Sequence, residues 1–212
     1  MTTLQARNLS LEEVHRLLGF EDRYNGSFEP WLAIDPLSET ECQELQQIQT
    51  DIRAYVIHSR FSEGQIRLIA VAPLLRLAGF YQHPVQLKVE EGIDRIEIDN
   101  ENTTISGRFD IVAIRKGDRP TETVDLWILA IETKEGLASL TAGLPQLLVY
   151  AYGSLETQNS VWGLLTNGID YSFIRIFRDR TPVYEYVRNF NLLYDRDSVQ
   201  LLQVLKAISQ GQ

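Results

Sequence analysis

Two strongly apolar runs near the middle of the chain constrain its fold more than any other feature. They cover residues 107–114 and 126–134, and the polar segment between them, 116–121, is rich in turn formers. Two such runs joined by a turn-forming segment predict a β-hairpin.

The first run is apolar on both faces of the predicted strand. Because side chains alternate along a strand, Val112 and Ile114 share one face, and Phe109, Ile111 and Ala113 share the other. Strands that are apolar on both faces belong inside a sheet that is covered on both sides.

Three charged residues lie within these apolar surroundings. Asp110 stands near the start of the first run, and Glu132 and Lys134 stand at the end of the second. Charges in such a place need partners. The period of 2 puts Glu132 and Lys134 on one face, with Cα atoms about 6.5 to 7 Å apart.

The register of the hairpin decides whether the two carboxylates meet. If Ile114 pairs with Leu126, Asp110 lies opposite Ala130 and diagonal to Glu132, about 7 to 8 Å away. Two carboxylates at this distance can bind one cation between them. A slip of one residue puts them on opposite faces, and sequence alone does not fix the register.

An Asp followed by a Glu-x-Lys after an apolar strand resembles the core of the PD-(D/E)xK nuclease superfamily. Segments 63–67 and 73–79 resemble the leading helix of the nuclease domain of type I restriction enzyme R subunits, and 162–168 resembles a strand and turn of that domain. Segment 146–150 matches the Gln-x-x-x-Tyr element found in some branches of the superfamily. The resemblance spans roughly residues 62 to 178.

The resemblance implies an α/β fold, a restriction-endonuclease-like mixed β-sheet flanked by helices. Residues 62–212 form this nuclease-like core with C-terminal strands and a helix. Residues 1–61 form an N-terminal helical extension that packs on the core, and a surface that faces a partner is the alternative interpretation.

The same resemblance implies a Mg²⁺-dependent nuclease that hydrolyses DNA phosphodiester bonds, with Mn²⁺ able to replace Mg²⁺. Asp110 and Glu132 are the expected metal ligands, and the Thr133 carbonyl is a further one. Lys134 is expected to orient the attacking water and to stabilise developing negative charge.

Two further site residues have competing interpretations. Glu63 stands in the first turn of a predicted helix, where an acidic residue complements the helix dipole, and the resemblance makes it an additional metal carboxylate. Gln146 shares a helix face with Tyr150 at i, i+4. It is either an amide beside a core aromatic residue or, by the resemblance, a group that positions a phosphate or water.

Composition narrows the function classes. The chain has 212 residues and a net charge of −9, whereas nucleic-acid binders usually carry a basic footprint. Cys42 is the only cysteine and the three histidines are scattered, so no Cys- or His-based metal site is expected. The phosphate loop that would bind ATP does not occur in the sequence.

The acidic charge keeps a second function class open, a catalytically inactive nuclease fold that serves as a binding or assembly module. Arg108 would then pair with Glu132, and Lys134 with Asp110, without a metal. A homodimer, RNA as the substrate, and endonuclease or exonuclease action also stay open. The absence of a long apolar run and of a signal peptide predicts a cytoplasmic protein without membrane contact.

Local signals place the remaining elements. Capping boxes at 10–13, 38–41 and 62–65 predict helix starts. The helix expected over 40–59 carries an apolar stripe, and Pro73 should kink or divide the helix over 63–77. The stripe consists of Leu45, Ile48, Ile52, Tyr55 and Val56.

Strands are expected at 84–90 and 95–98, and a helix is expected to run from Pro145 to about 152. Asn167-Gly168 predicts a hairpin between strands 160–166 and 170–177. A strand at 183–187 and a helix at 197–208 follow. This part has a local excess of basic residues, with arginines at 175, 178, 180 and 188. They either contact phosphate groups or are solvated charges that prevent pairing at a strand edge.

Overall fold

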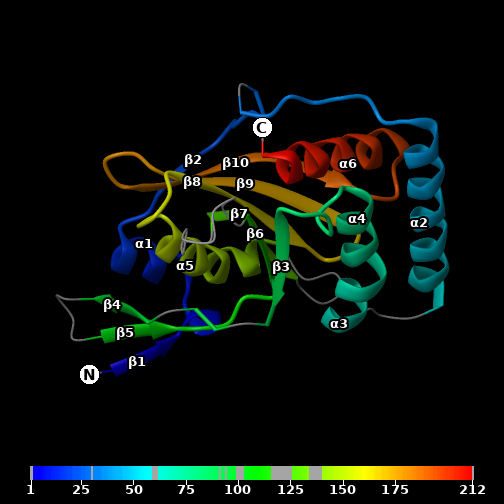
Figure 1. Ribbon diagram of the computed structural model, residues 1–212. Coiled ribbons are helices and arrows are strands. Elements are labelled where there is room, and N and C mark those ends of the chain that lie inside the picture. Colours follow the sequence, from blue (N-terminus) through cyan, green and yellow to red (C-terminus); the bar gives the residue numbers. More distant parts are fainter. Residues whose placement is uncertain are drawn as a thin grey trace.

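The structure is a computed structural model of the chain. It describes residues 2–29, 31–58, 62–90, 92–93, 95–98, 103–115, 126–133 and 140–211, with the backbone alone for 57, 58 and 126–133. The fold is α/β, with mixed β-sheets flanked by helices (Figure 1).

A seven-stranded mixed sheet forms the centre of the fold. The strand order is β2-β10-β9-β8-β7-β6-β3, and β7–β8 and β10–β2 are the parallel pairs. In this order the strands are β2 (Glu21–Arg23), β10 (Pro182–Asn191), β9 (Asp170–Arg178), β8 (Ser160–Thr166), β7 (Leu126–Thr133), β6 (Ile111–Arg115) and β3 (Val85–Val89).

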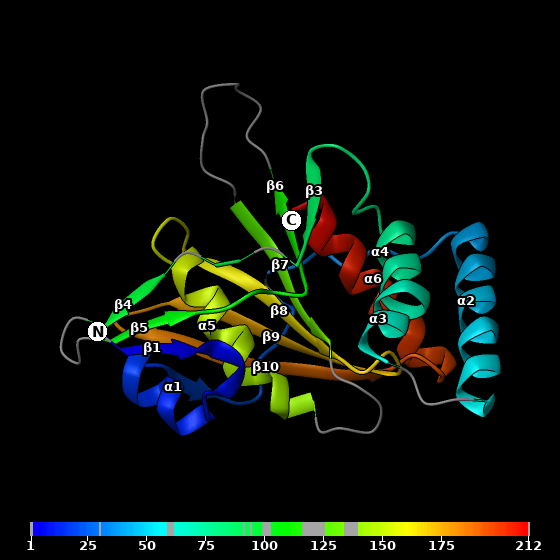
Figure 2. The same ribbon diagram turned by 90° about the horizontal axis from the view of Figure 1, so that it is seen from below.

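A second, three-stranded sheet lies beside the main sheet near the N-terminus (Figure 2). It has the order β1-β5-β4, where β1 is Thr2–Gln5, β5 is Thr103–Ser106 and β4 is Ile96–Ile98. The strand expected at 95–98 therefore exists, but it belongs to this small sheet.

Helices cover both faces of the main sheet. They are η1 (Ala6–Asn8), α1 (Leu11–Leu18), α2 (Glu39–His58), α3 (Glu63–Gln65), η2 (Ile66–Val71), α4 (Ala72–Leu77), η4 (Leu140–Gly143), α5 (Leu144–Ser154) and α6 (Asp195–Gln210). Within the described ranges, none of them combines the length and the apolar character that a membrane crossing needs.

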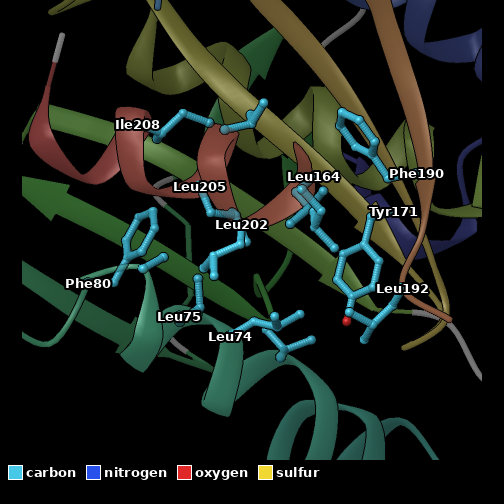
Figure 3. Packing of buried hydrophobic residues seen from close by; sticks show 14 of the residues in the cluster. Leu74, Leu75, Phe80, Leu164, Tyr171, Phe190, Leu192, Leu202, Leu205 and Ile208 are labelled. Atoms are coloured by element: carbon cyan, nitrogen blue, oxygen red, sulfur yellow. The ribbon is translucent and has the colours of Figure 1, made fainter. Parts of the chain in front are cut away.

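Two apolar clusters fill the space on either side of the sheet. One joins α2, η2, α4 and α6 to one face, where side chains such as Leu75 and Leu202 pack near Leu164 and Tyr171 (Figure 3). The other joins α1, α5 and the small sheet to the opposite face. Burial on both faces confirms the prediction of a covered sheet.

Strand β6 shows this alternation directly. Ile111 and Ala113 belong to the first cluster, and Val112 and Ile114 belong to the second. Phe109 was expected beside Ile111, which is wrong, because it packs in the second cluster. The backbone bends at Asp110 and β6 begins only at Ile111, so strand alternation does not extend back to Phe109.

The predicted antiparallel pairing of β6 with β7 is confirmed, but the register that paired Ile114 with Leu126 is wrong. Ile114 pairs with Trp127, and an irregularity between Ala113 and Ile114 shifts the register further, so that Ile111 pairs with Ile131. A β-bulge adds one residue to one strand and redirects the residues beyond it.

This register changes the expected neighbour of Asp110. The predicted position of Asp110 opposite Ala130 is wrong, because Ala130 pairs with Val112. Asp110 comes one residue before Ile111 and Glu132 one residue after Ile131. Both positions therefore lie next to the paired residues Ile111 and Ile131, at the point where β6 begins and β7 nears its end.

The hairpin predicted from Asn167-Gly168 is confirmed between β8 and β9. Gly168 has a φ of 88°, a left-handed conformation that glycine adopts at little cost. The Asn167 side-chain oxygen accepts hydrogen bonds from the backbone N–H groups of Ile169 at 3.0 Å and Asp170 at 2.8 Å. The turn is thus stabilised by its own side chains.

All three capping boxes form. The Ser10 hydroxyl accepts a hydrogen bond from the Glu13 backbone N–H, and Glu13 accepts one from the Ser10 N–H. Ser38 with Glu41, and Ser62 with Gln65, repeat the arrangement. These local contacts satisfy N–H groups that the helix itself leaves without partners.

Helix α2 packs on the core by the first part of its apolar stripe only. Leu45, Ile48 and Ile52 are buried, whereas Tyr55 and Val56 are exposed, so the stripe was predicted too long. Ile52 is the last buried member of the stripe, and the two following members, Tyr55 and Val56, extend past the packed surface.

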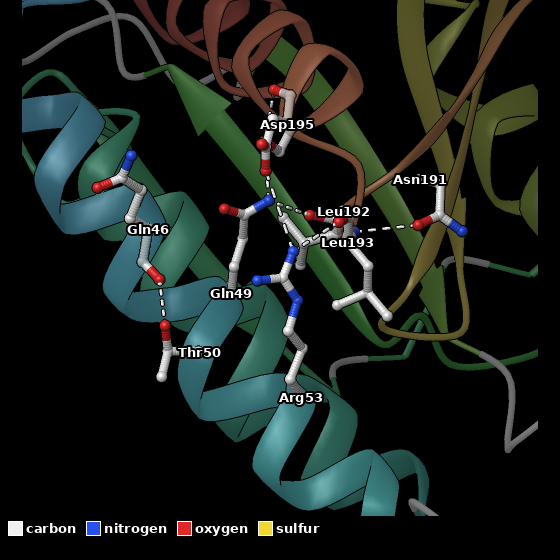
Figure 4. Close-up of polar contacts among 9 residues, drawn as sticks. Gln46, Gln49, Thr50, Arg53, Asn191, Leu192, Leu193 and Asp195 are labelled. Carbon is white, nitrogen blue, oxygen red and sulfur yellow. Dashed lines mark hydrogen bonds and ion pairs between the residues drawn. The ribbon is translucent and has the colours of Figure 1, made fainter.

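A polar contact also fixes α2 against the segment between β10 and α6 (Figure 4). The buried Gln49 side chain donates hydrogen bonds to the Leu192 carbonyl at 2.8 Å and to the Ser198 hydroxyl at 3.1 Å. Arg53 donates to the Leu193 carbonyl at 2.8 Å. These bonds and the buried half of the stripe support the packing interpretation of α2.

The N-terminal part is less helical than expected. Residues 2–5 pair with β5 and residues 21–23 pair with β10, so the segment contributes one strand to each sheet. Both strands are short and largely polar, without the apolar alternation by which a strand is recognised in sequence.

The helical stretch that includes Pro73 consists of α3, a π-helical segment and α4. Pro73 lies in the first turn of α4, where a missing N–H costs little. The predicted division at Pro73 is wrong, because α3, η2 and α4 follow one another directly and Val71 and Ala72 keep right-handed helical backbone angles. The irregularity of the helix is the π-helical segment Ile66–Val71 upstream of the proline.

Candidate functional site

A cleft of about 580 Å³ opens where the end of β3, the start of β6, η1, α3 and α5 meet. It is strongly polar. Its lining consists of Gln5, Arg7, Glu63, Arg67, Glu90, Ser106, Gly107, Arg108, Asp110, Gln146 and Tyr150. Four of the residues singled out from the sequence, Glu63, Asp110, Gln146 and Tyr150, thus share one cavity.

Asp110 stands at the bend that precedes β6, and only 15% of its side chain is exposed. The Arg67 guanidinium lies 3.8 Å from its carboxylate. This is an ion-pair distance and not a hydrogen bond. The bend exposes to the cleft a charge that the following strand would otherwise carry into the core.

Glu90 is a further carboxylate of the cleft, which sequence reasoning missed. It follows β3 directly, and its N–H donates a 3.1 Å hydrogen bond to the Asp110 carbonyl. Its carboxylate accepts a 2.6 Å hydrogen bond from Arg67 and lies 3.8 Å from Arg108. The pairing of β3 with β6 brings Glu90 to Asp110, and no local sequence signal predicts that pairing.

The backbone of Glu90 is strained. Its φ is 55°, in the left-handed region that residues other than glycine, asparagine and aspartate rarely adopt. Such a conformation costs about 1 to 3 kcal/mol and persists only where the surroundings enforce it. Strain of this kind concentrates at functional sites, so the position of Glu90 supports a functional interpretation of the cleft.

Arg67 connects the carboxylates. It lies in the π-helical segment η2, its Nε donates to the Glu63 carbonyl at 3.4 Å, and its Nη1 reaches both Glu90 and Asp110. π-helical turns occur often at functional sites because the extra residue redirects side chains. The sequence pattern 63–67 contained Arg67, but no role was assigned to it.

Glu63 fulfils the geometric condition of both interpretations. It is the first residue of α3, where its charge complements the helix dipole, and it also lines the cleft. Its distance from the other carboxylates is set by the helix that packs Ile66 into the core. Its role therefore stays a prediction.

Gln146 and Tyr150 project from α5 one turn apart, and both line the cleft. The Tyr150 hydroxyl accepts a 3.3 Å hydrogen bond from the Arg108 backbone N–H. A side chain at Gly107 would come within 2.8 Å of the Tyr150 ring, so only glycine permits this close approach. Tyr150 thus supports the cleft wall from the core.

The small sheet contributes the wall that sequence reasoning did not anticipate. Strands β1 and β5 are parallel, and the Gln5 side chain donates a 3.0 Å hydrogen bond to the Ser106 hydroxyl. Arg7 follows in η1 and lines the same cleft. Three arginines, at positions 7, 67 and 108, therefore face a cleft that also holds three carboxylates.

The Glu-x-Lys element lies at the limit of what the structure describes. Glu132 pairs with Leu165 and Thr133 with Thr166 in the parallel β7–β8 ladder. The side chain of Glu132 and all of Lys134 fall outside the described residues. The pairings proposed for Arg108 with Glu132 and for Lys134 with Asp110 fall outside them as well.

The donor atoms of the cleft fit a hard cation better than a soft one. Within the described side chains, no group of three His, Cys, Asp or Glu residues is close enough to hold a metal ion. The carboxylates that line the cleft, Glu63, Glu90 and Asp110, offer oxygen atoms only. Oxygen ligands in small number are what Mg²⁺ takes in nucleotide-processing sites.

A comparison of the chain with protein-family models and with curated proteins finds no match.

Proposed function

We propose that the chain is a Mg²⁺-dependent nuclease that hydrolyses DNA phosphodiester bonds, with a restriction-endonuclease-like core. One observation carries the proposal. Glu63, Asp110 and Gln146, which the sequence pattern singles out at widely separated positions, line a single cleft. Chance spacing of an Asp and a Glu-x-Lys would not bring the helical residues to the same cavity.

The backbone register adds support. Asp110 and Glu132 occupy the positions next to the paired residues Ile111 and Ile131, as two ligands of one cation require. Asp110, Glu132, the Thr133 carbonyl and Glu63 are the proposed ligands, for Mg²⁺ or for Mn²⁺ in its place. A bound divalent cation supplies a more acidic water and offsets negative charge at the phosphoryl group.

Arginine side chains of the cleft would bind the nucleic acid. Arg7 and Arg108 line the cleft, and arginine forks match phosphate oxygens. The described lining of the cleft holds as many arginines as carboxylates, so the cleft is less acidic than the chain, whose net charge is −9.

Gln146 and Lys134 complete the proposed site. The Gln146 amide lines the cleft and can position a phosphate oxygen or the attacking water by hydrogen bonding. Lys134 stabilises the negative charge that develops on the phosphoryl oxygens. Both roles rest on the resemblance to PD-(D/E)xK nucleases.

Purified protein incubated with plasmid and with linear DNA tests the proposal, in Mg²⁺, in Mn²⁺ and in EDTA. We expect cleavage in the presence of either cation and none in EDTA. Circular and linear substrates separate endonuclease from exonuclease action. An RNA of the same sequence, assayed in parallel, decides which nucleic acid is preferred. Absence of cleavage under every condition contradicts the proposal.

One observation favours a second function, that of a binding or assembly module. Arg67 already neutralises part of the acidic cluster, since it pairs with Glu90 and lies 3.8 Å from Asp110. A cleft that is balanced by its own arginines needs no metal for stability.

The variant Lys134→Arg distinguishes the two functions. Arginine keeps the charge but is bulkier and cannot give up its proton, so a catalytic lysine does not tolerate it. The nuclease proposal expects a large loss of cleavage with metal binding nearly unchanged. The binding-module alternative expects a change in stability alone, of about 1 kcal/mol or less.

A further inference from the structure

A second, apolar recess adjoins the cleft. It has a volume of about 340 Å³ and is lined by residues of η2, α4 and the edge strand β3. Arg67 and Glu90 line both cavities. The recess therefore opens directly beside the charged cluster.

The walls of the recess are unusually exposed for apolar side chains. Leu68 is 73% exposed, Tyr81 is 55% exposed and Val89 is 53% exposed. They make up three of the nine large hydrophobic side chains that are exposed within the described part of the chain. A contiguous apolar surface in a concave place indicates a bound partner, because water is a poor neighbour for it.

The backbone connects this recess to Asp110. Val89 pairs with Ile111 across β3 and β6, and Ile111 is the residue after Asp110. Arg67 and Leu68 are neighbours in η2, so one π-helical turn supplies a charged residue to the cleft and an apolar one to the recess. Neighbouring residues of the chain thus line the charged cleft and the apolar recess.

We propose that the recess receives the base of an unpaired nucleotide whose phosphate lies in the cleft. A nucleotide combines an anionic group with a flat, largely apolar ring system, and the two adjoining cavities provide those two chemistries. Bases stack on aromatic side chains regardless of sequence, and Tyr81 supplies such a ring. A base held inside a duplex cannot enter a recess, so the preferred substrate is single-stranded DNA or a frayed end.

The inference rests on the proposed function for the identity of the substrate, but binding tests it without cleavage. The probe is a short single-stranded oligodeoxynucleotide that carries 2-aminopurine, and the same strand in a duplex is the comparison. Both are titrated with the full chain in EDTA. We expect tighter binding of the single strand, with a change in fluorescence as the base leaves water.

Variants of the recess locate the effect. Tyr81→Ala and Leu68→Ser should weaken single-strand binding about 10-fold, as loss of one stacked or packed base predicts. Tyr81→Phe keeps the ring and should bind like wild type. Tyr194→Ala removes an equally exposed ring, 66% exposed and outside the recess, and should have no effect. Because Leu68 is so exposed, Leu68→Ser keeps the test valid if Tyr81→Ala does not fold.

The outcomes separate this inference from the proposed function. Single-strand binding that depends on Tyr81 and Leu68, without cleavage in any metal, supports the recess and overturns the nuclease. Cleavage of duplex DNA that both recess variants leave unchanged supports the nuclease and overturns the recess. Equal affinity for single strand and duplex in the wild type overturns the recess as well.

Discussion

Two groups of charged side chains in this protein look alike but differ in how their carboxylates are satisfied. One joins α2 to α6 through Glu41 and Lys206, whose side chains are 22% and 19% exposed. The other joins Arg67 to Glu90 and Asp110 in the cleft, with Arg67 20%, Asp110 15% and Glu90 47% exposed. Arg67 and Asp110 are thus buried about as deeply as the first pair, and Glu90 is the more exposed member.

The first group is complete. One oxygen of Glu41 accepts a hydrogen bond from Lys206, and the other accepts a 2.7 Å hydrogen bond from the Ser38 backbone N–H. Both oxygens are thus bound by donors of the chain itself. The group links two helices that already pack through apolar side chains, and its role is structural.

In the second group Arg67 contacts two carboxylates, and one of these, Glu90, also lies near Arg108. Arg67 donates a 2.6 Å hydrogen bond to Glu90 but lies 3.8 Å from Asp110. The backbone of Glu90 has a left-handed conformation. The comparison teaches that backbone strain and shared partners, and not the presence of charge, distinguish the cleft cluster from the structural pair. The predictions below test that distinction.

The largest effect is expected for Asp110→Asn. The change removes the charge of the proposed metal ligand and keeps its size, so cleavage should fall about 100-fold or more, as loss of several kcal/mol of charge stabilisation predicts. Initial rates on plasmid DNA in Mg²⁺ measure it. Asp179→Asn is the matched control, an exposed aspartate paired with Arg23 outside the cleft. Wild-type activity in Asp110→Asn removes the residue from the mechanism.

The second prediction compares Arg67→Met with Lys206→Met. Each variant removes the cation of its group, and each should lower the free energy of unfolding by about 1 to 2 kcal/mol, because charged hydrogen bonds at partly buried sites contribute about that much. Mg²⁺ should restore stability in Arg67→Met, since a divalent cation can replace the lost charge. It should leave Lys206→Met unchanged.

Urea unfolding of both variants, each with and without Mg²⁺, gives the four free energies of unfolding that the comparison needs. If Mg²⁺ stabilises neither variant, the cleft does not bind the cation in the way proposed. If it stabilises both alike, the effect of the cation is general and the distinction between the two groups fails.

Much of the fold follows from local signals. The capping boxes, the Asn167-Gly168 turn and the alternation along β6 each depend on neighbouring residues, and each appears where it was predicted. Strands β1 and β2 were missed because short polar strands carry no apolar pattern. The bulge in the β6–β7 register was missed because nothing in either strand marks it.

The candidate site divides in the same way. Glu63 and Gln146 were singled out from motifs within one helix each, and both line the cleft. Glu90 and Arg7 reach the cleft through pairings between distant strands, β3 with β6 and β1 with β5. Such contacts depend on topology, which no short segment encodes.

The third prediction measures the backbone strain at Glu90. Glu90→Gly and Glu90→Ala both remove the carboxylate, but only glycine accepts a φ of 55° without penalty. Glu90→Gly should therefore be more stable than Glu90→Ala by about 1 kcal/mol. At Gln86, which lies in the preceding strand β3 and lacks a left-handed backbone, glycine should be the less stable of the two. If the glycine and alanine variants rank in the same order of stability at Glu90 and at Gln86, the backbone of Glu90 is not strained.

The smallest effect concerns pH and the structural group. Burial raises the pKa of Glu41, but the hydrogen bonds from Lys206 and Ser38 lower it more, so the pKa lies below the ordinary value. A carboxyl whose pKa is lower in the folded state contributes stability above its unfolded pKa, and this contribution is lost as the pH falls through the folded value. Glu41→Gln keeps a side chain suited to the capping box but has no charge to lose. Wild type should exceed this variant by about 0.5 to 1 kcal/mol at neutral pH, and the difference should shrink as the pH falls below the ordinary pKa of a glutamate and through the lower folded value. Unfolding curves at a series of pH values from neutral to acid measure it, and a difference that does not change with pH shows that the charge of Glu41 contributes nothing.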